Sequence, residues 1–199
     1  MSKLQKQSSW KDYYKKVRSR PAHPLLKIAL EKSQGVGKAY DLGSGAGVDT
    51  LYLANLGWKV TAIDKEPSAL EFLKETKTEK GKIKTQNKPF EKIKLKKSDL
   101  ILSINSLPFC HPKKFKKLWK EIRHSLKPEG ILIGTLFGNN DTWAQKFSDD
   151  MSFFDHKGFS KLIGSKFDIL YFDEREDDRP TALGHMKHWH IYHFILKRC

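Results

Sequence analysis

Residues 41–47, Asp-Leu-Gly-Ser-Gly-Ala-Gly, constrain the fold of this chain more than any other segment. A short apolar stretch precedes them, and the amphipathic run 48–56 follows. The glycines therefore lie where a strand turns into a helix, and glycine permits a tight turn and close approach of the backbone to a ligand. The free N–H groups at the start of that helix would face the same ligand.

Asp64 ends the apolar run 58–63, 23 residues after Asp41. An acid at the end of the second strand of a βαβ unit typically binds a ribose. The dinucleotide pattern Gly-x-Gly-x-x-Gly/Ala would need a third small residue at Val48, and here that residue is Gly47 instead. Asp41 would repel a pyrophosphate but suits an ammonium group. The pattern thus favours a ligand with a ribose, an amine and no phosphate.

Residues 39–64 resemble motif I and the acidic post-motif of class I methyltransferases that depend on S-adenosylmethionine (SAM). The chain is also similar to a group of small bacterial methyltransferases distantly related to the tellurite-resistance methyltransferases, which end in a segment like 181–190. The resemblance implies SAM as cofactor. It also implies that Asp41 binds the methionine ammonium and that Asp64 binds the ribose, with Gly43, Ser44 and Gly45 giving close backbone approach.

Alternating strand and helix signals predict an α/β fold with a doubly wound, mostly parallel seven-stranded sheet and a C-terminal antiparallel hairpin. Residues 1–24 are predicted to form a polar lid or tail, and residues 25–199 the methyltransferase domain. Residues 138–155 are expected to be a loop, and a charged stretch is expected to join the last two strands. Predicted strands cover 38–42, 59–64, 83–86, 99–104, 131–137, 167–172 and 189–196.

Composition suits one cytoplasmic domain. The chain has 199 residues, no apolar run long enough to span a membrane, no signal-peptide core and only two cysteines. Its net charge of +15 leaves nucleic-acid binding open. However, lysine greatly outnumbers arginine, the residue preferred for phosphate and base recognition, which favours a solvated basic surface. The sequence leaves the oligomeric state open.

Further site residues are expected at the carboxyl ends of the parallel strands, where ligands of such sheets bind. The methyl-bearing end of SAM is expected near Ser103 and Asn105. The second and third strands are followed by Lys65 and Asn87, and we expect the Asn87 amide to contact the adenine. The methyl acceptor is expected near a set of aromatic and histidine residues, namely Tyr13, Tyr14, Phe109, His185, His188 and Trp189.

Two groups of residues carry alternative interpretations. Aromatic residues Trp10, Tyr13 and Tyr14 would either close over the cofactor or belong to a basic tail. The histidines at 185–193 lack a cysteine or carboxylate at tight ligand spacing, so no metal site is predicted.

Taken together, the sequence predicts methyl transfer from SAM to a small-molecule acceptor by in-line displacement, with no catalytic side chain assigned. Two alternatives remain open at this point. One is an RNA or DNA methyltransferase that uses the basic surface. The other is a non-catalytic module that binds SAM or another nucleotide.

Overall fold

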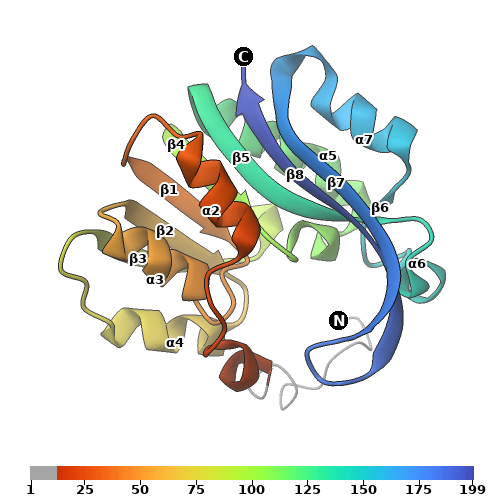
Figure 1. The fold of residues 1–199 in the computed structure, drawn as a ribbon, viewed down its shortest axis with the longest axis horizontal. Coiled ribbons are helices and arrows are strands. Elements are labelled where there is room, and N and C mark those ends of the chain that lie inside the picture. Colours follow the sequence, from red (N-terminus) through yellow and green to blue (C-terminus); the bar gives the residue numbers. More distant parts are fainter. Residues whose placement is uncertain (1–12) are drawn as a thin grey trace.

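The computed structural model describes residues 13–199, which form one mixed sheet in the strand order β3-β2-β1-β4-β5-β8-β7 (Figure 1). The first five strands are mutually parallel, and β8 runs antiparallel to both β5 and β7. The parallel strands are β1 (Lys38–Leu42), β2 (Lys59–Asp64), β3 (Lys82–Asn87), β4 (Ser98–Ser103) and β5 (Leu126–Gly138). The predicted α/β architecture is confirmed.

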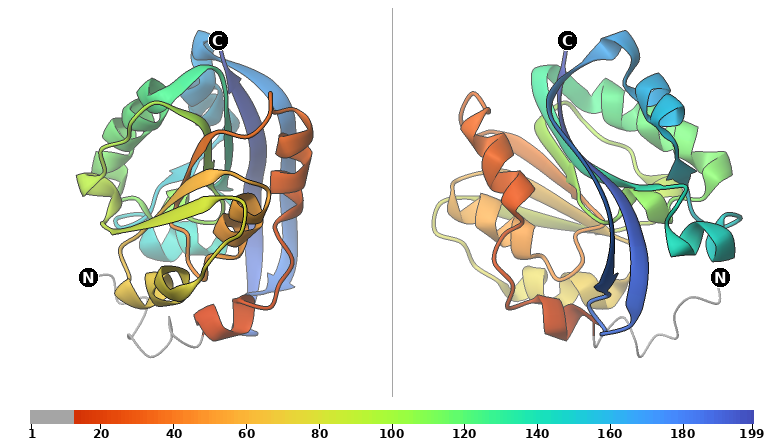
Figure 2. Two further views of the ribbon diagram at one scale, coloured as in Figure 1. Left: turned by 90° about the vertical axis from the view of Figure 1, so that its left-hand side faces the viewer. Right: turned by 45° about the vertical axis from the view of Figure 1, so that its right-hand side comes forward.

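Helices cover both faces of the sheet (Figures 1 and 2). One face carries α2 (Pro24–Glu31), α3 (Val48–Asn55) and α4 (Pro67–Glu75), and the other carries α5 (Pro112–Ser125) and α7 (His156–Ile163). The amphipathic helix α5 shows why: Phe115, Leu118 and Ile122 recur at helical spacing and are all buried, whereas its lysines face solvent. Residues 13–17 add a short helical segment, and 3₁₀ turns lie at 90–92, 107–109 and 164–166.

The segment 138–155 is not a simple loop, so that expectation was wrong. It contains α6 (Thr142–Phe147) and β6 (Phe153–Phe154), a short eighth strand that pairs with the end of β5. The helix forms because the Asp141 side chain caps it, accepting a hydrogen bond from Trp143 N at 2.9 Å. No helix within residues 13–199 has the length and apolarity needed to cross a membrane.

The C-terminal hairpin is much longer than predicted. Strands β7 (Phe167–Pro180) and β8 (Met186–Arg198) stay paired from Phe167–Arg198 out to Pro180–Met186, so the charged stretch 173–180 is strand. Beyond the edge of the parallel sheet the hairpin curves over the carboxyl ends of the other strands (Figure 1). It therefore forms one side of the space where ligands of such sheets bind.

A buried ion pair fixes α6 to this hairpin. Lys187 of β8 binds the Asp141 carboxylate, and their side chains are 3% and 0% exposed. The Lys187 ammonium also lies 3.7 Å from the ring centre of Trp189 and 4.5 Å from that of Trp143, which are favourable cation–π distances. Burial lowers the pKa of Lys187, and the Asp141 carboxylate opposes that shift.

Lys187→Met should destabilise the protein by about 3–5 kcal/mol, because it leaves the Asp141 carboxylate buried without a counter-ion. The matched control is Lys197→Met. Lys197 lies on the same strand and pairs with the half-exposed Glu129 at 3.0 Å, and exposed pairs contribute at most about 1 kcal/mol. Urea unfolding of both variants measures the difference. Equal losses would contradict a structural role for the buried pair.

Candidate functional site

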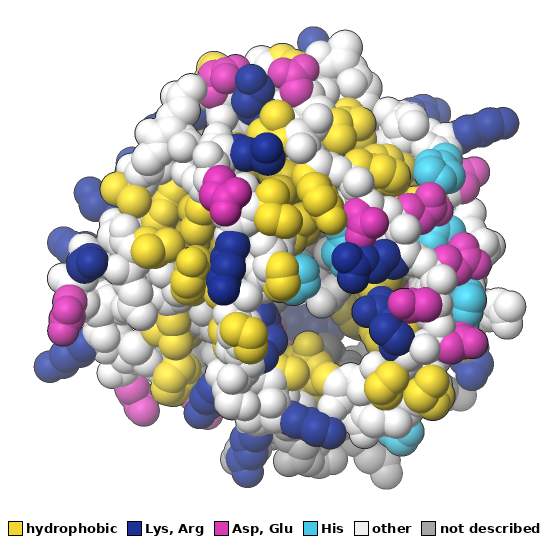
Figure 3. All heavy atoms as spheres, viewed as in Figure 1, with side chains coloured by type: hydrophobic (Ala, Val, Ile, Leu, Met, Phe, Trp, Pro, Cys, Tyr) yellow, Lys and Arg dark blue, Asp and Glu magenta, His cyan; other side chains and the backbone are white. Residues whose placement is uncertain are grey.

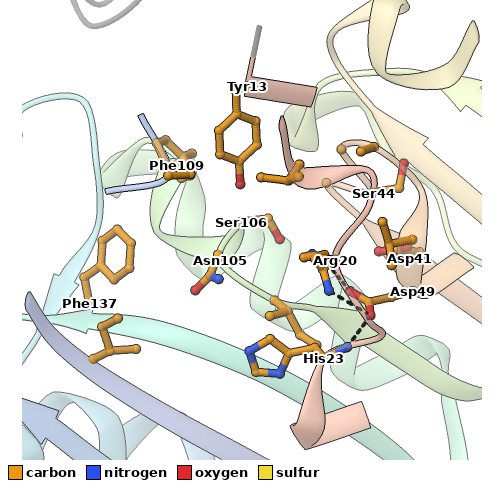
Figure 4. Close-up of a pocket in the computed structure, with 18 of the residues that line it drawn as sticks. Tyr13, Arg20, His23, Asp41, Ser44, Asp49, Asn105, Ser106, Phe109 and Phe137 are labelled. Carbon is orange, nitrogen blue, oxygen red and sulfur yellow. Dashed lines mark hydrogen bonds and ion pairs between the residues drawn. The ribbon is translucent and has the colours of Figure 1, made fainter. Parts of the chain in front are cut away.

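A cavity of about 1130 Å³ lies at the carboxyl ends of β1, β2 and β4. The glycine loop after β1 forms one wall, residues 13–25 form a second, and the β7–β8 hairpin forms a third. Figure 3 shows a hollow on this face of the molecule, and Figure 4 shows side chains of the first two walls, among them Ser44 and Tyr13, around the cavity. The volume slightly exceeds that of common ligand pockets and suits a cofactor together with a small second substrate.

The glycine loop needs its glycines for two separate reasons. Gly43 and Gly45 have φ angles of 73° and 50°, which disfavour residues with a Cβ atom. At Gly43 a Cβ would also lie 2.4 Å from Cβ of Ser106, whereas at Gly45 the nearest atom would be 3.5 Å away in the Tyr14 ring. The loop is therefore packed tightly at Gly43, whereas Gly45 lines the cavity and would keep only an ordinary contact with the Tyr14 ring.

Asp64 joins the loops that follow β1 and β2. One of its carboxylate oxygens accepts from Gly45 N at 2.9 Å, and the other accepts from Glu66 N at 2.9 Å. The side chain is 9% exposed and lines the cavity. Burial raises the pKa of Asp64, and the two backbone hydrogen bonds act against that rise. The carboxylate is therefore held in a fixed orientation at the cavity wall.

Asp41 lies deeper in the same wall, at 4% exposure. Thr50 Oγ1 donates to its carboxylate at 2.6 Å, and no other hydrogen bond to this side chain occurs within residues 13–199. Burial raises the pKa of Asp41 to about 7, and the nearby Asp49 carboxylate is the second cause of this rise. A buried acid with so little compensation would be stabilised as a carboxylate by a cation in the cavity.

Ser44 offers a second unmet polar group. Its hydroxyl oxygen is buried and lacks a hydrogen-bond partner among the described residues. Buried polar atoms normally find partners, so a ligand hydrogen bond at this position would remove a cost. The acids, the bare backbone at Gly45 and this hydroxyl fit a ligand with a cationic group and hydroxyls. We call Asp41, residues 43–46 and Asp64 the cofactor wall.

The N-terminal segment is attached beside this wall. Arg20 binds Asp49 of α3 at 2.5 Å, and the same carboxylate accepts from His23 N at 2.7 Å (Figure 4). Tyr13 and Tyr14 line the cavity, and Tyr14 is 4% exposed where it packs over Gly45 and Ala46. Trp10, which the sequence placed with these tyrosines, lies outside the described residues.

Opposite the glycine loop, the cavity is largely aromatic. Phe109 and Phe137 lie across the cavity from Asp41 and Ser44, and Asn105 lies between the two sides (Figure 4). Trp143 and Trp189 complete the group, with ring centres 5.6 Å apart. We call Phe109, Phe137, Trp143 and Trp189 the aromatic wall.

The structure brings most of the sequence-predicted site residues to this one cavity. The predicted residues that line it are Asp41, Gly43, Ser44, Gly45, Asp64, Lys65, Asn105, Tyr13, Tyr14, Phe109, His185 and Trp189.

Three predicted residues lie outside the cavity lining. The Asn87 amide donates to the carbonyls of Asp64 and Lys65 at 3.0 and 2.9 Å. Ser103 is fully buried and donates to the Leu42 carbonyl at 3.0 Å. His188 faces away from the cavity, where Asp178 and Glu176 bind its ring at 2.8 and 3.2 Å, because alternate residues of β8 point to opposite faces.

Sequence reasoning found some residues of the hairpin and of the segment before α2 but missed most of them, and it also missed residues of α3, β5, α6 and the loop after β4. The alternation Asp173, Arg175, Asp177 and Arg179 is a strand signal that could have been noticed. The missed lining residues include Arg20, His23, Asp49, Ser106, Phe137, Trp143, Asp173, Arg175, Arg179, Ile191 and His193.

Comparison with known proteins agrees with this geometry. Residues 39–130, which span the glycine loop through the start of β5, match the family model of a methyltransferase domain. The matched segment contains the whole cofactor wall. The family match and the shared fold agree with the SAM-dependent methyltransferase that the sequence predicts, and the solved structures with this fold include a SAM-dependent methyltransferase from Methanosarcina mazei. No curated protein matches the chain.

Solved structures share the fold at low sequence identity. TehB from Haemophilus influenzae is 20% identical with a TM-score of 0.77, and the match covers 96% of this chain and 67% of TehB. A 1,6-didemethyltoxoflavin-N1-methyltransferase from Burkholderia thailandensis is 21% identical with a TM-score of 0.68, covering 96% and 84%. The N-methyltransferase NodS from Bradyrhizobium japonicum is 14% identical with a TM-score of 0.65, covering 94% and 97%.

Gly43→Ala should destabilise this protein by about 1–3 kcal/mol more than Gly45→Ala. Both variants place a Cβ on a left-handed residue, which costs about 1–2 kcal/mol, but only the first also overlaps Ser106 and so incurs an overpacking cost of about 1–3 kcal/mol. Thermal and urea unfolding of the two variants give the comparison. Equal stabilities would show that the contact beneath the loop does not restrict residue 43.

Proposed function

We propose that this enzyme transfers the SAM methyl group to a small organic acceptor that binds between the cofactor wall and the aromatic wall. SAM supplies an electrophilic methyl carbon that an acceptor heteroatom can displace in line, with the bonding pair of the carbon–sulfur bond left on sulfur. The carrying observation is one cavity with two chemically different sides. Its acidic wall suits a cationic cofactor, and its aromatic wall suits an apolar partner (Figure 4).

The residues of the cofactor wall would divide the binding work. Asp64 would accept hydrogen bonds from the ribose hydroxyls, since the Gly45 and Glu66 N–H groups already fix its orientation. Asp41 would bind the methionine ammonium, directly or through water. The Ser44 hydroxyl, which has no partner among the described residues, would form a hydrogen bond with the cofactor. The absence of a side chain at Gly45 would let the cofactor approach the backbone closely.

Orientation and exclusion of water would supply most of the rate, because the cofactor already has a good leaving group. Asn105 lies at the junction of the two sides. Its backbone N–H donates to Thr135 Oγ1 at 2.7 Å, and its side-chain oxygen accepts from the same hydroxyl at 3.3 Å. Its amide nitrogen makes no hydrogen bond within residues 13–199 and could position a substrate. Tyr13 and Tyr14 would cover the cofactor and keep water out.

A small acceptor accounts for the cavity better than a nucleic acid. Among residues 13–199, the lysines that line it are Lys65 and Lys88 alone, so the other lysines of the described chain are not arranged around the reacting centre. The β7–β8 hairpin and residues 13–25 further enclose the space. One structural neighbour, the B. thailandensis enzyme, is named for a small acceptor, 1,6-didemethyltoxoflavin.

Isothermal titration with S-adenosylhomocysteine (SAH) and with NAD tests cofactor choice. We expect SAH to bind and NAD not to bind. Asp64→Asn should weaken the binding of SAH by about 1–3 kcal/mol, the scale of a hydrogen bond to a charged group. Asp99→Asn, at a partly exposed acid outside the cavity, is the control and should bind SAH normally. Binding of NAD without SAH would reject the assignment, and SAH binding without turnover on any acceptor would favour a non-catalytic module.

SAH affinity should rise about tenfold between pH 6 and pH 8. With its pKa raised to about 7, Asp41 is mostly protonated at pH 6 and mostly ionised at pH 8, and the ligand ammonium favours the ionised form. Binding below pH 7 must therefore release a proton. Titrations at three pH values, repeated with Asp41→Asn, measure this. An equally steep pH dependence in the variant would assign the proton to another group.

A further inference from the structure

The arginines of this chain are concentrated at the cavity. Among residues 13–199, which contain all six arginines, three arginines line the cavity, against two lysines, Lys65 and Lys88. Surface charge alone would not produce this difference, since lysine supplies nearly all of the basic surface. Arginine differs from lysine in presenting a planar set of donors that matches the two oxygens of a carboxylate or phosphate. The cavity is therefore selectively supplied with the side chain best suited to an anionic oxygen group.

Two of these arginines, Arg175 and Arg179, lie on one face of β7. Each uses its Nε to bind the acid two residues before it, Asp173 at 2.7 Å and Asp177 at 2.6 Å. Such bonds restrict the guanidinium groups. Their terminal nitrogens make no hydrogen bond with any residue in 13–199, so four strong donor groups remain available to a ligand.

Arg20 is different. One of its terminal nitrogens binds Asp49 at 2.5 Å, and the other binds the Pro21 carbonyl at 2.9 Å. It therefore attaches the N-terminal segment to α3, next to the cofactor wall. The two hairpin arginines are the ones with open donors.

The hairpin arginines are adjacent to the aromatic wall. Trp189 of β8 donates from its indole nitrogen to the Arg179 carbonyl at 3.0 Å. Arg175 pairs in register with Ile191, which also lines the cavity. The acids of the cofactor wall, Asp41 and Asp64, belong to strands on the other side of the cavity. An anionic group would be repelled by those acids, whereas at the hairpin each aspartate is already paired with an arginine Nε, so the open guanidinium nitrogens are the groups that would bind it.

Resting on the proposed function, we infer that the methyl acceptor is a small organic anion. Its flat apolar body binds the aromatic wall, and its carboxylate or phosphate group binds the terminal nitrogens of Arg175 and Arg179. The acceptor heteroatom then faces the cofactor side near Asn105. The arginines determine which molecules enter and how they are oriented, and take no part in bond making.

Matched probes of equal shape and different charge test this inference. We would titrate SAH-loaded protein with benzoate, benzamide, phenyl phosphate and inorganic phosphate. Benzoate should bind at least tenfold more tightly than benzamide, and phenyl phosphate more tightly than inorganic phosphate, which lacks the aromatic body. The double variant Arg175→Gln/Arg179→Gln should lose the preference for the anions. Arg123→Gln, an arginine outside the cavity, should keep it.

Each outcome has a separate meaning. If SAH binds and neither organic anion is preferred, or the double variant keeps the preference, the inference is overturned while the proposed function stands. If the double variant loses SAH affinity instead, the arginines hold the cofactor carboxylate, and the inference is again wrong. Equal affinities for inorganic phosphate and phenyl phosphate would show that the aromatic wall does not bind an apolar body, and would overturn that part of the inference. Failure of SAH itself to bind would reject the proposed function.

Discussion

The Asp64 carboxylate is the contact on which the geometry of the site most depends. It accepts from Gly45 N and from Glu66 N, so it fixes the loops after β1 and β2 relative to one another. These two loops form the cofactor wall. The Gly43 N–H adds a hydrogen bond to the Ile63 carbonyl at 2.7 Å, one residue before Asp64. The hydrogen-bonding groups that a ligand would contact are therefore already oriented, so binding costs little entropy for ordering them.

The long β7–β8 hairpin lies opposite the cofactor wall and encloses the cavity with it. Because side chains alternate along a strand, one face of β7 and β8 presents Arg175 and Trp189 to the cavity. The other face pairs histidines with acids, as His190 does with Glu174 at 2.7 Å. The position of the hairpin depends on the buried Lys187–Asp141 pair, which joins it to α6. An isolated hairpin would be marginally stable, so this pair and the aromatic packing around it determine the shape of the acceptor side.

Local patterns made the cofactor side predictable, while long-range pairing hid the acceptor side. Asp41 and Asp64 could be located because strand, glycine turn and second acid follow at fixed spacing in one βαβ unit. The charged stretch 173–180 looked like a loop because both faces of that strand are polar, so hydrophobic alternation was absent. Asn87 follows β3 as expected, yet its amide bonds two backbone carbonyls. Position along the chain does not determine which way a polar side chain turns.

A crystal structure of the SAH complex tests the central claim most directly. The account predicts the ribose hydroxyls at Asp64, the ammonium at Asp41, and the sulfur facing Asn105 and the aromatic wall, with Arg175 and Arg179 still free of the cofactor. SAH bound with its ribose away from Asp64, or with its carboxylate on the hairpin arginines, would contradict the division of the cavity into a cofactor side and an acceptor side.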